Sequence, residues 1–422
     1  MPARMGRTTE VHGDDPIYQK MHASWQADPK TWEPLTHGLR DAMVKFAAEH
    51  CPYYARMGVG NRTFEKIPLL TKSIIRENAE GLLAEGGAIE RRIPKITSGS
   101  TGQPLKFYRD MSEGPICRAA RHFLKQLHRV PESATMVWIG TRPSTVDKER
   151  VHQVPVPELT SERAQEEARL WTSFDQYWLY GHASAIDWVA AVIEERRLPA
   201  RNPPSCVITT ADLLTEHAEQ RIGRVFRCPV HSWYGSNEFD GFLAGTIPGT
   251  RRYVFNPLLA YVEVLRDDGE PVRPGETGNL VVTDLNNYVF PFIRYVTGDL
   301  ATVGSERMIG GWTIVERIEG RSSEIIQLPN GHILTPVILG HLLFLRNDFG
   351  SMIRFYQCAQ TAHDRLELRL VWQNPPSPED RSRIEAALHG AVGPEMKVRI
   401  ADIACLDKLP SGKTWILRRE FS

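Results

Sequence analysis

The sequence predicts an α/β protein with two domains of unequal size, and three features of the chain support this. Apolar, strand-like runs alternate with helical periods in the first half, short strands separated by tight turns recur after Arg252, and a second α/β pattern begins near Ser322. A chain of 422 residues is also long for one domain. We therefore expect parallel α/β sheets plus a distorted β-barrel in residues 1–320, and a small α/β domain in residues 321–422.

The N-terminal segment is expected to contain two helices after a start without a clear period. Residues 1–30 lack periodicity and are expected to form a loosely docked arm. Residues 35–50 predict an amphipathic helix, whose apolar stripe consists of Leu35, Leu39, Met43, Phe46 and Ala47. Thr71 or Ser73 is a candidate N-cap for a helix that ends near Leu83.

Strand and helix signals then alternate along the chain. A short strand at 93–96 leads into a Gly-rich loop, and residues 112–128 predict a helix. Buried strands and helices follow in turn, with strands at 136–140, 205–210 and 230–234 and helices at 183–197 and 215–226. This alternation favours a mainly parallel sheet with helices on both faces.

The pattern changes after Arg252. Short strands at 261–265, 279–283 and 312–316, separated by turns such as Arg273-Pro274-Gly275, predict a distorted β-barrel or an antiparallel sheet. From about Ser322, a hairpin at Pro329-Asn330-Gly331 and a helix at 378–391 predict the small domain.

Composition excludes several classes of partner. Lys plus Arg and Asp plus Glu both count 51, so the net charge of zero argues against nucleic acid as the main partner. The six cysteines form no C-x-x-C pair, which fits scattered thiols in a reducing cytoplasm. The polar start has no apolar signal region, and no apolar run approaches the ~20 residues that cross a bilayer. We therefore expect a cytoplasmic protein without a membrane partner.

A loop rich in glycine and hydroxyl groups stands after the first predicted strand. Its residues are Thr97, Ser98, Gly99, Ser100, Thr101 and Gly102. The glycines allow close backbone approach, and the N–H and O–H groups can donate to phosphate oxygens. The loop is not a Walker A motif, because Gly-Lys-Ser/Thr is missing. Taken alone, such a segment is more often an ordinary loop.

Two further motifs place carboxylates after predicted strands. Trp233-Tyr234-Gly235-Ser236-Asn237-Glu238 ends a strand, where α/β sheets bind ligands, and offers a ring for a base and a carboxylate for magnesium. Arg294-Tyr295-Val296-Thr297-Gly298-Asp299 places a carboxylate after a glycine turn, where it can accept both hydroxyls of a ribose. Each motif also has a purely structural interpretation as a turn.

Two C-terminal segments complete the set. Glu319-Gly320-Arg321-Ser322-Ser323-Glu324 contains the small residues that suit a pivot between domains. Leu409-Pro410-Ser411-Gly412-Lys413 places an ammonium on a turn, from which it can reach a distant site as a point charge.

All five motifs, in this order, resemble those of the AMP-forming adenylating superfamily of acyl-CoA ligases, luciferases and adenylation domains. Within that superfamily the chain looks like the short phenylacetate-CoA ligase type, including the branch with coenzyme F390 synthetases. Cys51-Pro52-Tyr53-Tyr54 and Ile67-Pro68-Leu69-Leu70-Thr71-Lys72 resemble N-terminal phrases of that type. The resemblance runs from about residue 40 to the end and is specific for the superfamily rather than for a substrate.

The resemblance implies a role for each motif. The loop at 97–102 would cradle the ATP phosphates, and Tyr234 would pack against adenine beside Gly235 and Asn237. The remaining roles concern charged groups: Glu238 would bind Mg²⁺, Asp299 would hold the ribose hydroxyls, Arg321 would lie near ribose and phosphates, and Lys413 would bridge the carboxylate and the α-phosphate. The small domain carrying Lys413 would be a mobile lid that begins at about residue 321.

The chain departs from the superfamily pattern at three positions. Gln103 stands where a lysine often follows the loop, and Lys106 lies nearby. Asn237 replaces a threonine before the motif glutamate, and Ser323 occupies the usual acidic hinge position with Glu324 next to it. These departures leave the pivot residue open and do not change the expected reaction.

The expected function is ATP-dependent activation of a carboxylic acid with release of pyrophosphate, followed by transfer to coenzyme A. An aromatic acid is favoured because rings are dense between residues 171 and 188, although these rings can also be core: Trp171, Phe174, Tyr177, Trp178, Tyr180 and Trp188. Trp138 lies on a preceding predicted strand. The alternatives are an amine or carrier-protein thiol as acceptor, AMP transfer to a hydroxyl as in F390 synthetases, or a homologue without activity that binds a nucleotide or a metabolite. ATP, Mg²⁺, CoA and the acid are the expected partners, and the oligomeric state, a homodimer included, is left open.

Overall fold

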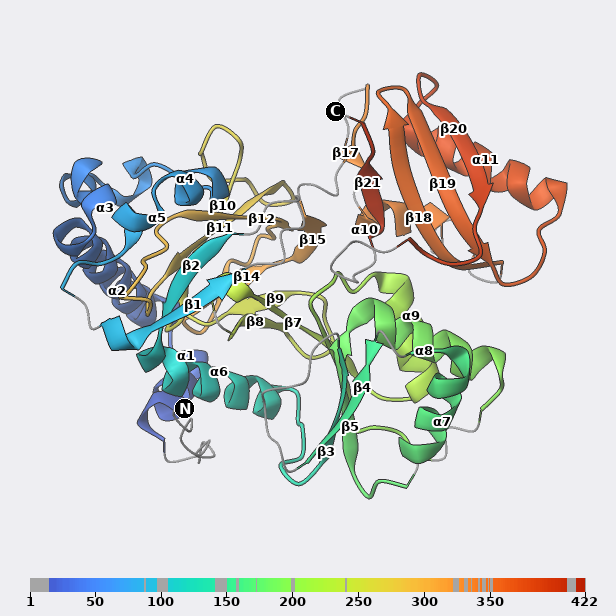
Figure 1. Ribbon diagram of the computed structural model, residues 1–422, viewed down its shortest axis with the longest axis horizontal. Helices are drawn as coiled ribbons and strands as arrows, with labels where there is room; N and C mark the ends of the chain where they lie inside the picture. Colours follow the sequence, from blue (N-terminus) through green and yellow to red (C-terminus); the bar gives the residue numbers. More distant parts are fainter. Residues whose placement is uncertain are drawn as a thin grey trace.

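The computed structural model describes residues 15–86, 89–96, 105–140, 150–156, 159–171, 173–198, 202–239, 241–321, 326–329, 333–334, 336–340, 342–343, 347, 349, 352–407 and 415–421. Figure 1 shows a large part built from mixed α/β layers and a smaller C-terminal sheet domain beside it. The predicted fold class is confirmed in this mixed α/β architecture.

Helices cover one side of the large part near the N-terminus. They are α1 (Pro16–Gln26), α2 (Pro29–His50), α3 (Pro52–Arg56), η1 (Val59–Asn61), η2 (Phe64–Lys66), α4 (Lys72–Glu77), α5 (Ala79–Leu82) and η3 (Ile89–Arg91). Thr71 caps α4 as predicted, but the expected helix to Leu83 divides at Asn78, whose side chain donates to the carbonyl of Ile74.

The expected loose arm at residues 1–30 is wrong for the part that the structure describes. Asp15 and Asp28 cap α1 and α2, and each helix has proline in its first turn. The Trp25 ring packs 5.5 Å from that of Trp312, and the carbonyl of Ser24 accepts a hydrogen bond from the backbone of Gly311. These long-range contacts, which no local period reports, dock α1.

Two antiparallel strands flank the predicted phosphate loop in the sequence. β1 (Arg92–Ile96) pairs antiparallel with β2 (Lys106–Asp110), and Ile96 lies opposite Lys106. Residues 97–102 and Gln103 lie outside the described residues.

A nine-stranded sheet forms the centre of the molecule, in the order β13-β14-β9-β8-β7-β6-β5-β3-β4. Its strands are β3 (Thr135–Gly140), β4 (Val151–Pro155), β5 (Tyr177–His182), β6 (Val207–Thr210), β7 (Val230–Ser236), β8 (Gly241–Thr246), β9 (Tyr253–Phe255), β13 (Met308–Ile309) and β14 (Trp312–Val315). Strands β4, β3, β5, β6 and β7 run parallel, as the alternating pattern predicts, and β8, β9, β14 and β13 continue the sheet antiparallel.

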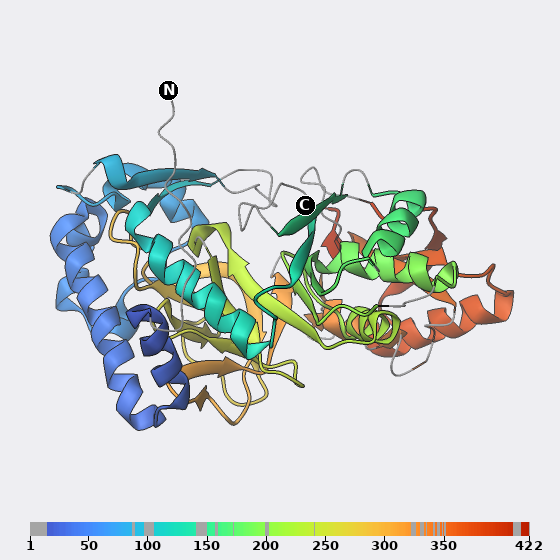
Figure 2. The same cartoon turned by 90° about the horizontal axis from the view of Figure 1, so that it is seen from below.

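Helices cover both faces of the parallel strands. One face packs against α7 (Ser161–Trp171), α8 (Ala183–Glu195) and α9 (Glu216–Phe226). The other packs against α6 (Gly114–Leu127), which follows η4 (Met111–Glu113) and lies along the strands in Figure 2.

A second sheet of four antiparallel strands lies beside the first, and it corresponds to the region predicted as a barrel or antiparallel sheet. Its order is β10-β11-β12-β15, formed by β10 (Ala260–Leu265), β11 (Thr277–Asp284), β12 (Tyr295–Thr302) and β15 (Arg317–Arg321). The β12–β15 pairing places Asp299 directly opposite Arg321.

The C-terminal domain has its own sheet and its own hydrophobic cluster, which runs from Ile326 to Leu417. The sheet order is β20-β19-β18-β21. Its elements are β16 (Ile326–Gln327), β17 (Ile333–Leu334), α10 (Pro336–Gly340), β18 (Ile353–Ala362), β19 (Arg365–Trp372), α11 (Pro378–Val392), β20 (Lys397–Asp402) and β21 (Leu417–Arg419). β16 and β17 form the predicted hairpin, although Asn330 and Gly331 lie outside the described residues.

The two parts touch through α8, α9 and β18. Arg221 donates to the carbonyl of Arg354 at 3.1 Å, and Arg354 pairs with Glu195 at 2.8 Å. Among the described helices, none is long and apolar enough to cross a membrane.

Candidate active site

Three residues predicted from separate motifs meet where β7, β12 and β15 come together. The Tyr234 hydroxyl donates to Asp299 Oδ2 at 2.6 Å. On the other side of the carboxylate, Arg321 Nε lies 3.9 Å from Asp299 Oδ1. Sequence reasoning therefore named three side chains that the fold brings together, although Tyr234 and Asp299 are 65 positions apart in the chain.

The surroundings of this group raise the pKa of both the Asp299 carboxyl and the Tyr234 phenol. Burial raises the pKa of Asp299, while the Tyr234 hydrogen bond and the charges of Arg321 and Lys72 oppose that rise. Burial and the Asp299 charge raise the pKa of Tyr234 far above its ordinary value. The phenol therefore stays protonated and donates a hydrogen bond to Asp299. A carboxylate in this setting is a suitable acceptor for ligand hydroxyl groups.

Lys72 is a neighbour of the site that sequence reasoning did not assign a role. A Cβ atom added to Gly298 would lie 3.8 Å from Lys72 Nζ, so the ammonium stands beside the turn that precedes Asp299. The chain is held there because Leu70 pairs with the strand residue Tyr295. The sequence motif Ile67–Lys72 includes this lysine, but the motif does not indicate that Lys72 lies near Asp299.

Glu238 is buried on η6 (Asn237–Phe239), directly after β7. Its carboxylate Oε1 accepts from the Tyr295 hydroxyl at 3.0 Å, and its backbone carbonyl accepts from Arg109 Nη1 at 2.6 Å. No described residue donates to Oε2, which leaves one carboxylate oxygen available to a ligand.

The donor set at Glu238 fits Mg²⁺. Magnesium prefers hard oxygen ligands and is commonly bound by one or two carboxylates together with substrate phosphates. The described residues contain no cluster of three or more His, Cys, Asp or Glu side chains that could hold a metal by itself. A single carboxylate with a free oxygen suits a cation that arrives with a nucleotide.

Arg109, on β2, is a second residue that sequence reasoning missed. Its side chain is 2% exposed and pairs with the carboxylates of Glu113 and Asp284 while it donates to the Glu238 carbonyl. Asp284 in turn accepts from the backbone of Asn286 at 2.9 Å. This network joins the hairpin that flanks residues 97–102 to the turn that carries Glu238. In the sequence, Arg109 looks like an ordinary solvent-facing strand residue.

The middle of the 233–238 motif is shaped by close approach of two strands. A Cβ atom on Gly235 would lie 2.2 Å from the carbonyl oxygen of Gly241, so only glycine fits at this position. Ser236 Oγ is buried without a hydrogen-bond partner among the described residues, and Asn237 is exposed. The Tyr234 ring lies 5.7 Å from the Phe255 ring.

The rings predicted to bind an acid divide between the two faces of the sheet, because successive strand residues point to opposite sides. Trp171 and Tyr177 belong to the core under α7–α9, so they are core residues rather than ligand contacts. Phe174 and Trp188 pack against that same core. On the α6 face, Trp178 and Tyr180 join a different group of rings.

The rings on the α6 face form one contiguous group, which we call the aromatic cluster: Trp138, Trp178, Tyr180, Trp233 and Phe242. Tyr180 lies 4.8 Å from Trp138, 5.5 Å from Trp178 and Trp233, and 6.0 Å from Phe242. His182 is buried, with its ring 6.3 Å from that of Trp138. Among the predicted aromatic residues, Trp138, Trp178 and Tyr180 thus lie on this face, where Trp178 and Tyr180 are buried and Trp138 is partly exposed.

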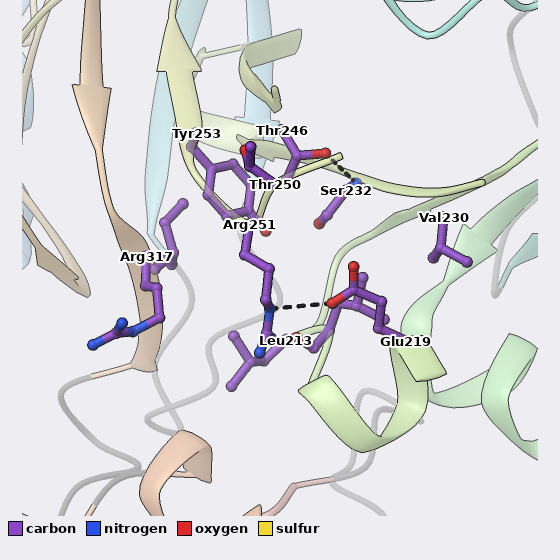
Figure 3. Close-up of a pocket in the computed structure, with 11 residues that line it drawn as sticks. Leu213, Glu219, Val230, Ser232, Thr246, Thr250, Arg251, Tyr253 and Arg317 are labelled. Atoms are coloured by element: carbon purple, nitrogen blue, oxygen red, sulfur yellow. Dashed lines mark hydrogen bonds and ion pairs between the residues drawn. The ribbon is translucent and has the colours of Figure 1, made fainter. Parts of the chain in front are cut away.

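Two cavities lie away from these residues. The pocket in Figure 3, between Ser232, Thr246, Arg251, Tyr253 and Arg317, has a volume of about 20 Å³, which suits one water molecule. Arg251 pairs there with Glu219 at 3.1 Å. A larger cavity of about 600 Å³ lies beside α2, α3 and η1. Neither is lined by Tyr234, Glu238, Asp299 or Arg321.

Other predicted residues cannot be placed. The loop at 97–102, Gln103, Ser322–Glu324 and Lys413 lie outside the described residues. Their roles remain predictions from the sequence.

Comparisons with known proteins agree on the fold. No protein-family model matches the chain. Protein CapK of Staphylococcus aureus is 23% identical over 299 residues, covering 67% of this chain and 64% of that protein, so the match spans less than two thirds of the relative.

Solved structures of CoA ligases resemble most or nearly all of the chain. 2-Hydroxyisobutyryl-CoA ligase in its postadenylation state has a TM-score of 0.75 at 17% identity, covering 99% of this chain and 95% of that one. The same ligase in its thioesterification state, with CoA, has a TM-score of 0.58 at 17% identity, with coverage of 99% and 95%. The anthranilate CoA ligase AuaEII, in complex with anthranoyl-AMP, has a TM-score of 0.55 at 13% identity and covers 78% and 67%.

These likenesses show that the chain has the fold of these CoA ligases. Membership of the AMP-forming adenylating superfamily, which the five motifs indicate, remains a prediction. The phenylacetate-CoA ligase-like branch remains a prediction.

Proposed function

We propose that this protein is an AMP-forming carboxylate–CoA ligase. It activates a carboxylic acid with ATP as an acyl-adenylate and then transfers the acyl group to the thiol of coenzyme A. The observation that carries the proposal is the grouping of Tyr234, Asp299 and Arg321 within hydrogen-bond or ion-pair reach. The fold is that of CoA ligases whose solved complexes contain acyl-AMP and CoA.

In the first step, a carboxylate oxygen of the acid attacks the α-phosphorus of ATP, and the bond to the pyrophosphate oxygen breaks. Asp299 accepts the ribose hydroxyls, and Tyr234 orients Asp299 and lies against the base. Arg321 and Lys413 offset the negative charge that develops on the α-phosphate. Glu238 would hold Mg²⁺, which would supply charge neutralisation at the phosphates.

In the second step, the CoA thiolate attacks the acyl carbon and AMP leaves with the former carboxylate oxygen. The loop at 97–102 holds the departing pyrophosphate in the first step and does not take part in the second. We assign the large domain to residues 1–320 and the lid to residues 321–422, with the pivot near Arg321. The higher TM-score with the postadenylation state of 2-hydroxyisobutyryl-CoA ligase, 0.75 against 0.58, supports a lid position closer to that of this state than to that of the thioesterification state.

We further propose that the acid is aromatic. The aromatic cluster lies on the sheet face next to the 233–238 motif, because Trp233 belongs to both. Ligands of parallel α/β sheets bind at the carboxyl ends of the strands, where Trp138 and Tyr180 stand.

The test is acid-dependent release of pyrophosphate across a panel of aromatic and aliphatic acids, with and without CoA, and mass spectrometry of the products. We expect release that requires an acid, an acyl-adenylate without CoA and a thioester with it. Pyrophosphate release that needs an amine or a hydroxyl compound instead of an acid would contradict the proposal and favour one of the other acceptors.

A further inference from the structure

The buried arginines in the described part of the chain have a carboxylate partner. Arg109 pairs with Glu113 and Asp284, Arg221 with Asp187, and Arg294 with Glu263. This is expected, because a guanidinium removed from water is costly unless an anion or several acceptors replace the water.

Arg121, on α6, is half-buried and has no carboxylate partner among the described residues. Its Nε is buried and has no hydrogen-bond partner, and no ion pair in the described part of the chain includes it. Since the side chain is only partly exposed, its charge is neither fully solvated nor paired. Such a group is a candidate for binding an anionic or hydrogen-bond-accepting ligand.

The position of Arg121 on α6 directs it toward the strands. One turn before it, Cys117 lies 3.6 Å from the point where a Cβ on Gly241 would stand. One turn after it, Leu124 lies 2.8 Å from the equivalent point on Gly245. Residues three and four apart share a helix face, so Arg121 lies over β8 between these two contacts, at the level of Phe242.

The surroundings of Arg121 are the aromatic cluster. Its charge is close enough to act on the Tyr180 hydroxyl, which also hydrogen-bonds to Thr210 at the end of β6. Phe242 lies 4.9 Å from Trp233 and, like Trp138, is partly exposed. A cation beside flat apolar rings provides both a surface for stacking and a fixed charge for a substituent.

We propose that Arg121 is a substrate-binding residue, and that the acid is an aromatic carboxylic acid with a second carboxylate or hydroxyl group on its ring. This inference rests on the proposed function and names the substrate class of that site. The ring lies against the aromatic cluster, and the guanidinium of Arg121 binds the ring substituent. The reacting carboxylate points toward Tyr234 and Asp299.

The chemistry of the first step argues that Arg121 binds the substituent rather than the reacting carboxylate. A bidentate ion pair between Arg121 and the reacting carboxylate would lower the nucleophilicity of that carboxylate and hold it away from the α-phosphate.

The experiment measures kcat/KM for benzoate and for its hydroxy- and carboxy-substituted derivatives with wild type, Arg121→Leu and Arg121→Lys. We expect wild type to prefer a substituted acid. Arg121→Leu should reduce the ratio of substituted to unsubstituted acid by about 10- to 100-fold, because a polar group that loses its partner is strongly discriminated against. Arg121→Lys should restore part of the ratio.

Lys125→Leu is the matched control. Lys125 is on the same helix, one turn further on, with its Nζ 5.9 Å from the centre of the Trp178 ring. This variant removes a cation next to the aromatic cluster, and we expect it to leave the substrate ratio unchanged. A ratio measured within one variant does not depend on the fraction of the sample that is folded.

The outcomes separate the two proposals. An equal fall for all acids in Arg121→Leu, or an unchanged ratio, overturns the assignment of Arg121. If wild type releases no pyrophosphate with any acid, the ligase proposal fails. In that case acid-induced shifts in melting temperature still test Arg121: a substituted benzoate that stabilises wild type but not Arg121→Leu supports the binding role, and equal shifts in both proteins contradict it.

Discussion

Replacement of Arg109 tests how the site is held together. Arg109→Met removes the cation from two carboxylates that are 2% and 3% exposed, Glu113 and Asp284. Breaking a buried ion pair in this way costs about 3–5 kcal/mol. Loss of the charged hydrogen bond to the Glu238 carbonyl adds about 1.5–3 kcal/mol. The sum is a large share of the ~5–15 kcal/mol that stabilises a typical protein, so we expect little folded Arg109→Met.

Arg109→Lys is the informative variant. An ammonium keeps the charge but cannot reach three acceptors with the geometry of a guanidinium. We expect a folded protein with a lower melting temperature. Because Glu238 would no longer be fixed through its backbone, we also expect the Mg²⁺ concentration for half-maximal pyrophosphate release to rise several-fold.

Two assays test whether Arg109 positions Glu238: thermal melting, and pyrophosphate release titrated with Mg²⁺. Arg40→Lys serves as control, because Arg40 is buried but pairs with Asp41 and stacks on Phe64, away from Glu238. The control should lower stability and leave the Mg²⁺ dependence unchanged. A lower melting temperature for Arg109→Lys with wild-type Mg²⁺ dependence would refute the positioning argument.

Three further predictions concern the site and the core. Asp299→Asn removes a charged acceptor and should raise the KM for ATP about 10- to 100-fold in steady-state assays, with little change for the acid; an unchanged KM for ATP would exclude Asp299 from ribose binding. Burial lowers the pKa of His128 to about 3 and of His231 to about 4, so the unfolded chain binds more protons below pH 6.5. Stability should therefore fall below pH 6.5 by up to about 1.4 kcal/mol per pH unit for each histidine, and His128→Gln should flatten this slope in melts between pH 7.5 and 5; an equal slope in both proteins would show that His128 is not a source of the pH dependence. Lys413→Ala should lose about 10²–10³-fold in pyrophosphate release but still consume a preformed acyl-adenylate; equal loss in both assays would indicate a fixed site without lid movement.

Strand-end motifs made much of the candidate site predictable. Tyr234 and Asp299 each follow a strong strand signal, and strands end where ligands bind in this kind of sheet. The sequence could not report that the Tyr234 hydroxyl donates to Asp299, because the two belong to different sheets. Their pairing depends on packing between sheets that no local pattern encodes.

Sequence patterns did not predict the positions of Arg109 and Arg121, and the physical reason is the same for both residues. Arg109 and Arg121 are charged, so pattern rules place them at the surface, yet tertiary structure buries Arg109 and most of Arg121. The sequence could not assign the rings near residues 171–188 to one face of the sheet, because a parallel sheet that is covered on both sides has apolar residues on both faces. The sequence did not predict helix α1, because this helix lacks a strong apolar period. It is stabilised by the Asp15 cap and by contacts of Ser24 and Trp25 with residues that are far away in the sequence.

The most direct test of the central claim follows an oxygen atom. If the carboxylate attacks the α-phosphorus of ATP, one carboxylate oxygen stays with AMP after the thiol attacks the acyl carbon. Wild type would be incubated with ATP, CoA and an acid labelled with ¹⁸O in its carboxylate, and the AMP analysed by mass spectrometry. We predict AMP that contains one ¹⁸O atom. Unlabelled AMP beside a labelled product would contradict the proposed mechanism.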